Sequence, residues 1–166
     1  QENTGFQREL QEAASYSADW RSYFASSASA HDWMLQYLGR WSEVLFPGFT
    51  ALILGMCGIV LSLRSGTSMA REPAGWGAGT TAFYLLMFVM TIWASFGPAA
   101  GLYSVLYQTV PVFSLLRAPA RFGIAVTLAL SVFVALATAA LLGRITPHAR
   151  RWATAGLLLF VVVELS

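Results

Sequence analysis

The chain has 166 residues, of which 57% are hydrophobic and 11% are charged, and its formal net charge is +2. Soluble domains carry about 25% charged residues, so this composition is not that of a protein whose whole surface faces water. The arginines stand at the ends of apolar segments, which argues against the clustered basic face of a nucleic-acid partner, and the single cysteine, Cys57, excludes an internal disulfide and a cysteine-based metal site.

The polar part of the chain is residues 1–43, which hold six of the eight acidic residues. Within it, residues 32–42 carry aromatic and apolar side chains at helical spacing, namely Trp33, Met34, Tyr37, Leu38 and Trp41. Trp and Tyr favour the headgroup level of a bilayer, so we expect an interfacial helix that leads into the first membrane span. An amphipathic helix packed on protein would show the same pattern and is the alternative.

Four later segments are apolar for long enough, or nearly so, to cross a bilayer core of about 30 Å. They are residues 44–63, 80–96, 122–143 and 152–166. Pro47 is acceptable in the first turn of a helix, and the segments are separated by short stretches that hold glycine, proline or arginine. The sequence therefore predicts an all-α fold: a polytopic transmembrane helical bundle of about four spans over residues 44–166, preceded by a polar segment over residues 1–43.

The distribution of arginine predicts the orientation of these spans. The loops over residues 64–79 and 144–151 hold two and three arginines, and the opposite side has Arg40, Arg117 and Arg121 near its spans. Positive charge favours the cytoplasmic side of a membrane. We therefore expect residues 1–43 and the stretch 97–121 to lie on the extracytoplasmic side.

The stretch 97–121 is apolar but interrupted by prolines, so it is neither a full span nor an ordinary soluble loop. Residues 101–109 can form a short helix with Tyr103 and Tyr107 one turn apart. These two rings are candidates to stack on a sugar or a polyprenyl chain. The alternative is that they anchor the segment at the membrane interface.

Arg117 and Arg121 flank Pro119, and proline favours the first turn of a helix, so the span over 122–143 should begin here. A helix N-terminus with two guanidinium groups is suited to bind a phosphate. The alternative is that both arginines extend to lipid headgroups and only anchor the helix.

The remaining candidates are weaker. Glu164 would lie inside the last span, where carboxylates are costly and often functional, unless it lies near the end of the span and reaches water. Asp19 and Asp32 fit solvated or helix-capping roles. His31 and His148 have no partner pattern around them, and the sequence predicts no metal site and indicates no cofactor.

Three sequence motifs in the chain resemble motifs of one group of large bacterial membrane proteins. The longest match is Leu102-Tyr-Ser-Val-Leu-Tyr107 followed by Val110-Pro-Val-Phe-Ser-Leu-Leu-Arg-Ala-Pro-Ala-Arg-Phe122. Ser17-Ala-Asp-Trp20 and Glu43-Val-Leu-Phe-Pro-Gly48 are similar as well. The chain resembles the YfhO-like proteins and the related GT-C-type glycosyltransferase-like proteins of the cell envelope. We expect it to be a section of such a polytopic protein in the bacterial inner membrane.

The resemblance implies an enzyme, or an enzyme-like protein, that uses polyprenyl-phosphate-linked sugars at the outer face of the membrane. In GT-C-type enzymes the catalytic acid lies in an early outer loop, which we expect to lie outside this stretch, so the resemblance carries over no catalytic residue. The resemblance leaves a lipid-phosphate role for Arg117 and Arg121. A transporter or flippase, or a non-catalytic envelope scaffold, is the alternative.

Overall fold

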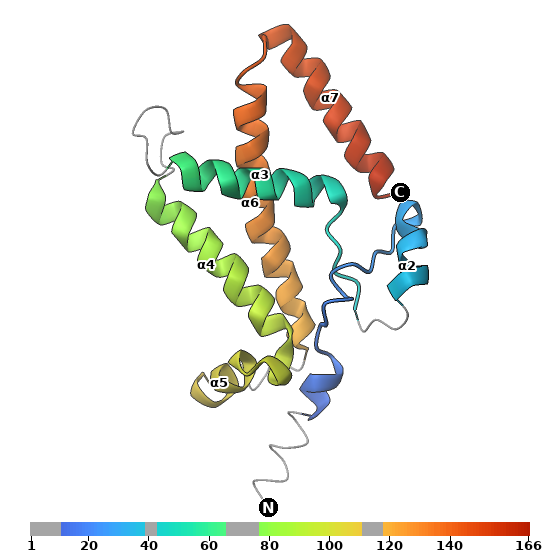
Figure 1. Ribbon diagram of the computed structural model, residues 1–166, viewed down its shortest axis with the longest axis vertical. Coiled ribbons are helices and arrows are strands. Elements are labelled where there is room, and N and C mark those ends of the chain that lie inside the picture. The colour runs from blue at the N-terminus through green and yellow to red at the C-terminus, as the bar shows by residue number, and fades with distance from the viewer. Residues whose placement is uncertain (1–10, 39–42, 66–76, 111–117) are drawn as a thin grey trace, which may run out of the picture.

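The computed structural model describes residues 11–38, 43–65, 77–110 and 118–166. Over these residues the chain forms helices joined by turns, without a β-strand, which confirms the predicted all-α class (Figure 1). The α-helices are α2 (Asp32–Leu38), α3 (Phe49–Ser65), α4 (Ala78–Ser95), α5 (Leu102–Thr109), α6 (Phe122–Leu142) and α7 (Pro147–Glu164). Short 3₁₀ helices stand beside them: η1 (Ser29–His31), η2 (Gly97–Ala100) and η4 (Pro119–Arg121).

Two helical stretches in the described part of the chain are long and apolar enough to cross a membrane. They are α4 and the continuous stretch Pro119–Leu142, which joins η4 to α6. In the most apolar 18 residues of each, only 17% and 28% of the residues are buried. The core helix of a soluble protein would be mostly buried, so these two helices need lipid or further protein against their exposed sides.

The prediction of four spans is wrong for the first and the last segment. The expected span over 44–63 begins only at Phe49, because Pro47 has no amide hydrogen and Gly48 has a left-handed φ of +96°. The 17 residues of α3 measure about 25 Å at 1.5 Å per residue, which is less than a hydrocarbon core of about 30 Å.

The segment expected over 152–166 belongs to α7, which begins at Pro147, before the apolar run starts. Pro147 occupies the first turn of α7, where proline is favoured, so Arg150 and Arg151 lie inside the helix and Glu164 ends it. Three charged residues in an 18-residue helix are more than an isolated span tolerates well. None of the residues of α7 is buried, and the helix leans away from α6 (Figure 1).

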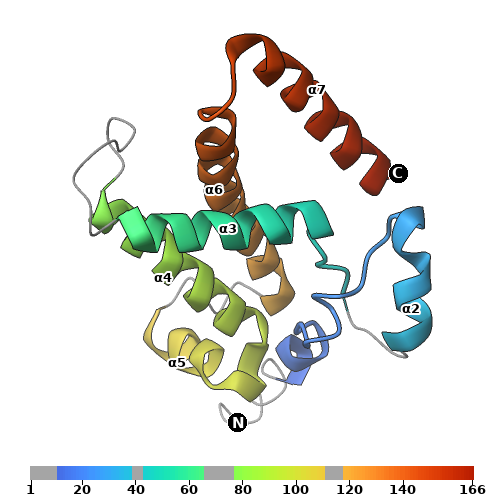
Figure 2. The same cartoon turned by 45° about the horizontal axis from the view of Figure 1, so that its top comes forward.

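The core of the fold is formed where α3 lies across α4 and α6 (Figures 1 and 2). One stripe of α6 is buried, at intervals of three or four residues with one adjacent pair: Gly123, Val126, Ala129, Leu130, Phe133 and Ala137. On α3, Gly55 and Gly58 face this stripe at Leu130 and Phe133. Small residues at a helix crossing let two backbones approach closely, which is how apolar helices associate in a membrane.

The N-terminal segment is attached to one end of α4 and α6. The Ala18 amide donates to the Ser95 carbonyl at 2.9 Å, and the Ala120 amide donates to the Tyr16 carbonyl at 3.1 Å. Gly97 adopts φ +68° at this junction, and a Cβ there would lie 1.9 Å from the hydroxyl oxygen of Ser17. Residues 16–18 therefore lie at the same end of the two helices as the described part of 97–121, and the extracytoplasmic position of both stretches stays a prediction.

Helix α2 confirms the shared face expected within residues 32–42, of which 39–42 lie outside the described residues. Four of its side chains line one open hollow of about 430 Å³ together with three from neighbouring segments: Trp33, Met34, Tyr37 and Leu38, with Trp20, Phe24 and Phe49. Met34 is buried, whereas the Trp33 and Tyr37 side chains are exposed. An interfacial position of α2 stays a prediction.

Replacing Tyr23 with phenylalanine should cost about 1 kcal/mol of folding free energy, because it removes one long-range hydrogen bond without leaving a cavity. The Tyr23 hydroxyl lies 2.7 Å from the Ser95 hydroxyl. Ser95 donates its own proton to the Ile92 carbonyl at 2.7 Å, so Tyr23 is the donor to Ser95. Thermal unfolding in detergent micelles measures the loss, and Tyr16→Phe, at an exposed tyrosine, is the matched control and should melt as the wild type does.

The same variant should change the response to alkaline pH. Burial raises the pKa of Tyr23 above its ordinary value of 10.0, and the hydrogen bond with Ser95 opposes this rise only in part. The folded state then keeps a proton that the unfolded state loses, so stability is constant below about pH 10 and falls as the pH rises further. Tyr23→Phe should show a smaller fall above pH 10, and an identical fall would contradict the burial of this hydroxyl.

Candidate functional site

The predicted phosphate site is described only at Arg121, because Arg117 lies outside the described residues. Arg121 is the last residue of η4, its side chain is exposed, and α6 follows it directly. The Arg121 amide donates to the Ala118 carbonyl at 3.1 Å, and the Phe122 amide donates to the carbonyls of Pro119 and Ala120. These two amides are already engaged, so an anion here would be bound by the guanidinium and not by these amides.

The two predicted tyrosines lie together on α5, with ring centroids 6.2 Å apart and planes inclined at 39°. Tyr103 is fully buried, which raises its pKa, and Tyr107 is half-buried. The buried ring of Tyr103 has no face open to a sugar in this arrangement. In the described part of the chain, no hydrogen bond or cation–π contact joins Arg121 to either tyrosine.

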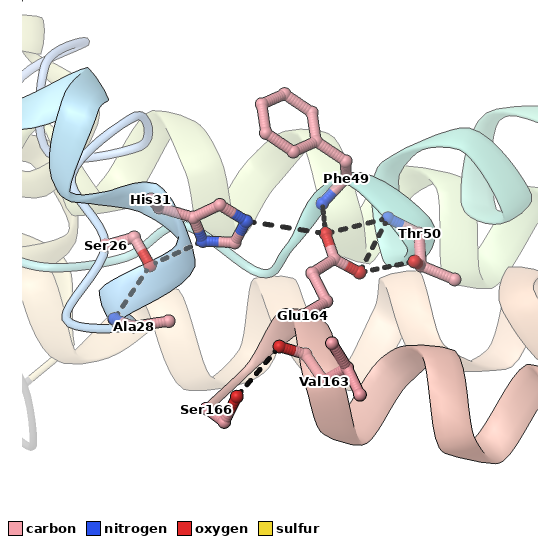
Figure 3. Close-up of polar contacts among 8 residues, drawn as sticks. All are labelled: Ser26, Ala28, His31, Phe49, Thr50, Val163, Glu164 and Ser166. Carbon is pink, nitrogen blue, oxygen red and sulfur yellow. Dashed lines mark hydrogen bonds and ion pairs between the residues drawn. The ribbon is translucent and has the colours of Figure 1, made fainter.

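A second group of polar residues surrounds the carboxylate of Glu164, and we call it the Glu164 cluster: Ser26, His31, Phe49, Thr50 and Glu164 (Figure 3). The carboxylate accepts hydrogen bonds from the Phe49 amide, from the Thr50 amide at 3.2 Å and from the Thr50 hydroxyl. Phe49 and Thr50 are the first residues of α3, whose leading amides have no acceptor within the helix. Glu164, at the C-terminal end of α7, therefore caps the N-terminus of α3. A negative charge at a helix N-terminus also interacts favourably with the helix dipole.

Gly48 makes this approach possible. A Cβ at this position would lie 3.2 Å from the Glu164 Oε1 atom, and its φ of +96° is one that side-chain-bearing residues rarely adopt. Glycine thus provides both the turn that starts α3 and the room for the carboxylate.

His31 links the cluster to the N-terminal segment. Its Nε2 atom lies 3.7 Å from Glu164 Oε1, and its Nδ1 atom lies 2.9 Å from the Ser26 hydroxyl. The His31 ring is buried and stands edge-on to Phe46 and Phe49, with centroids 5.1 and 5.4 Å away. Figure 3 shows Ser26, His31 and the Glu164 carboxylate in a row.

This row resembles the order of a nucleophile, a base and an orienting acid, but the arrangement does not support hydrolysis. Ser26 is only 5% exposed, and its oxygen also accepts the Ala28 amide at 3.2 Å. The lone pairs of the Glu164 carboxylate are occupied by the start of α3. The cluster is best explained as a clamp that joins three distant parts of the chain: η1, the start of α3 and the end of α7.

Sequence reasoning missed this clamp. The sequence allows Glu164 to reach water near the end of a span, but its side chain is only 8% exposed and lies 3.7 Å from His31, which is far from it in sequence. One signal was present: Gly48 precedes α3 where a capping Ser, Thr, Asp or Asn is usual, so the helix needed an acceptor from elsewhere. Among the described residues, no group of three His, Cys, Asp or Glu side chains is placed to hold a metal ion.

Comparison with known proteins adds no relative: no family model, curated protein or solved structure matches the chain.

Proposed function

We propose that the chain is part of an integral membrane protein, similar to GT-C-type glycosyltransferases, that binds a polyprenyl-phosphate-linked sugar at the extracytoplasmic face of a bacterial inner membrane. The observation that carries the proposal is the exposed Arg121 at the start of α6, the longest apolar helix described. Its cationic side chain stands where the apolar run begins, which is the boundary between lipid and water if α6 spans the membrane.

The face of α6 that follows Arg121 suits the lipid part of such a donor. Ile124 and Leu128 lie one and two turns further along the helix, and both are well exposed, at 74% and 58%. A polyprenyl chain can lie along these side chains while its phosphate pairs with the guanidinium. A charge-assisted hydrogen bond to phosphate contributes about 1.5–3 kcal/mol.

Among the described residues, no carboxylate forms an ion pair with Arg121, and the proposal assigns it donor binding alone, with no catalytic acid or base. The transporter alternative has less support. The sequences of α3, α4 and α6 carry no Asp, Glu, Lys, Arg or His in their middles, whereas ion-coupled transporters place such groups near the midplane.

Replacing Arg121 with glutamine should weaken binding of polyprenyl phosphate by about tenfold or more, because the cation that pairs with the phosphate is lost. The full-length protein is reconstituted in phosphatidylcholine vesicles, and binding is followed by quenching of tryptophan fluorescence. Transfer from a radiolabelled polyprenyl-phosphate sugar is measured in the same vesicles.

Arg151→Gln, which removes the same charge from the first turns of α7, is the control and should bind as the wild type does. Flotation of the vesicles checks that each variant is inserted in the membrane. Equal binding by Arg121→Gln and the wild type, with both inserted, would refute the role of Arg121. A wild-type protein that floats with the vesicles but binds no polyprenyl phosphate would refute the glycosyltransferase-like function.

A further inference from the structure

A second feature of the fold lies on the opposite half of α6 from Arg121. An apolar groove of about 370 Å³ runs between α3 and the C-terminal part of α6. It is lined by Met56, Cys57, Val60, Leu61, Ala140 and Leu141, together with Arg144, which follows α6. Several of these side chains are open to the outside, because Met56, Val60 and Leu141 are each more than 40% exposed.

The groove ends where α6 ends, and this end is positively charged. Arg144 follows the last turn of α6 and is exposed, and among the described residues no carboxylate forms an ion pair with it. A second guanidinium is held beside it, because the Arg150 Nε atom donates to the Leu142 carbonyl at 3.1 Å.

None of the described acidic residues lines the groove. The described acidic residues are Glu12, Asp19, Asp32, Glu43 and Glu164. Four of them belong to the N-terminal segment, and Glu164 lies at the other end of α7, about 20 Å along the helix from Arg151 at 1.5 Å per residue. The positive potential at the end of the groove is therefore not neutralised by any described part of the chain.

We propose that this groove binds an anionic phospholipid, with an acyl chain against the apolar walls from α3 and α6 and the phosphate paired with Arg144 and Arg150. The shape and the charge both favour this ligand. The walls are apolar and belong to helices that would face lipid, and the cations lie at the level where α6 leaves the apolar zone. Basic sites at the ends of transmembrane helices bind anionic headgroups in this way.

The proposal depends on the membrane insertion proposed above, but not on glycosyl transfer. It also differs from the simple anchoring of an arginine at the headgroup level, because anchoring needs no groove. If the groove matters, filling it must reduce lipid binding even when both arginines are intact.

The test uses two photoactivatable lipids, phosphatidylglycerol and phosphatidylcholine, that carry the same diazirine-labelled acyl chain. The full-length protein is reconstituted with an equal mole fraction of either probe in phosphatidylcholine vesicles, and cross-linked residues are mapped by mass spectrometry. We expect the phosphatidylglycerol probe to cross-link groove residues about fivefold more than the phosphatidylcholine probe does. Arg144→Gln should bring this ratio close to one, and Arg151→Gln, which lies outside the groove lining, should leave it unchanged.

Cys57→Trp fills the groove and should remove its cross-links, while cross-links to the exposed faces of α4 and α6 persist. Equal labelling of the groove by both probes in the wild type, or a preference that survives Arg144→Gln, would overturn the proposal. So would an unlabelled groove in a protein whose α4 and α6 are labelled, since protein would then cover it. Absence of labelling on every helix would instead show that the chain is not inserted, and would refute the proposed function as well.

Discussion

Replacing Gly58 with alanine should destabilise the fold by about 2 kcal/mol, although alanine is the better helix former. A Cβ at Gly58 would lie 1.9 Å from the carbonyl oxygen of Phe133 and 2.6 Å from its carbonyl carbon. These are backbone atoms of α6, so the clash is relieved only if α3 and α6 move apart. Overpacking costs about 1–3 kcal/mol, and a clash with backbone atoms belongs at the upper end of this range. The gain in helix propensity offsets about 1 kcal/mol, which leaves a loss of about 2 kcal/mol.

The measurement is thermal unfolding in detergent micelles, followed by circular dichroism. For a chain of this size a loss of about 2 kcal/mol lowers the midpoint by about 4–8 °C. Gly58→Leu should prevent the crossing altogether, because a large side chain cannot be accommodated against a backbone. If Gly58→Ala melts at the wild-type temperature, α3 and α6 do not cross at this point.

Two other glycines of the chain provide matched controls for the same substitution. At Gly55 the nearest atom to a new Cβ is the Cδ1 atom of Leu130, 2.3 Å away, and this end of a flexible side chain can rotate aside. Gly156 on α7 has nothing within 4 Å of such a Cβ. Gly55→Ala should therefore cost less than Gly58→Ala, and Gly156→Ala should be neutral or raise the midpoint, because only the helix propensity changes there.

Most of the secondary structure could be predicted from local signals. A long apolar run without proline or charge specifies α6, which was expected over 122–143 and is observed as Phe122–Leu142. Pro119 marks its start, and Gly101 at φ +82° marks the start of α5, which was expected over 101–109. Proline and glycine act on the backbone directly, so the sequence reports these boundaries without tertiary information.

The wrong or missing predictions concern the residue at which α3 begins and the contacts between residues that are distant in sequence. From apolar composition alone, the first span is predicted to begin at residue 44. The backbone turns at Gly48, however, and α3 begins at Phe49. The partners of Glu164 and Tyr23 could not be predicted, because His31 and Ser95 are distant in sequence and no local pattern relates the pairs. Helix packing also depends on the crossing at Gly58, whose role is visible only once α6 lies against it.

Replacing Glu164 with alanine should release the start of α3 and the end of α7 together, because alanine has no side-chain oxygen to accept these hydrogen bonds. The carboxylate is the acceptor for the Phe49 and Thr50 amides and for the Thr50 hydroxyl. Loss of a helix cap costs about 0.5–2 kcal/mol. Loss of the favourable interaction between the carboxylate and the helix dipole costs a further ~0.3–1 kcal/mol. We therefore expect a loss of about 2 kcal/mol in detergent micelles, and Glu12→Ala, at an exposed carboxylate, should have no measurable effect.

Amide hydrogen exchange separates a local capping role from general destabilisation. The amides of Phe49 and Thr50 are protected by Glu164 alone, because the first amides of a helix have no acceptor within it. In Glu164→Ala these two amides should exchange about tenfold faster or more, whereas amides in the middle of α6 should change much less. Thr50→Val keeps both amide bonds and removes only the hydroxyl, so it should leave the exchange of Phe49 nearly unchanged. Exchange that accelerates equally along the whole chain, or not at all at Phe49 and Thr50, would mean that α7 does not cap α3.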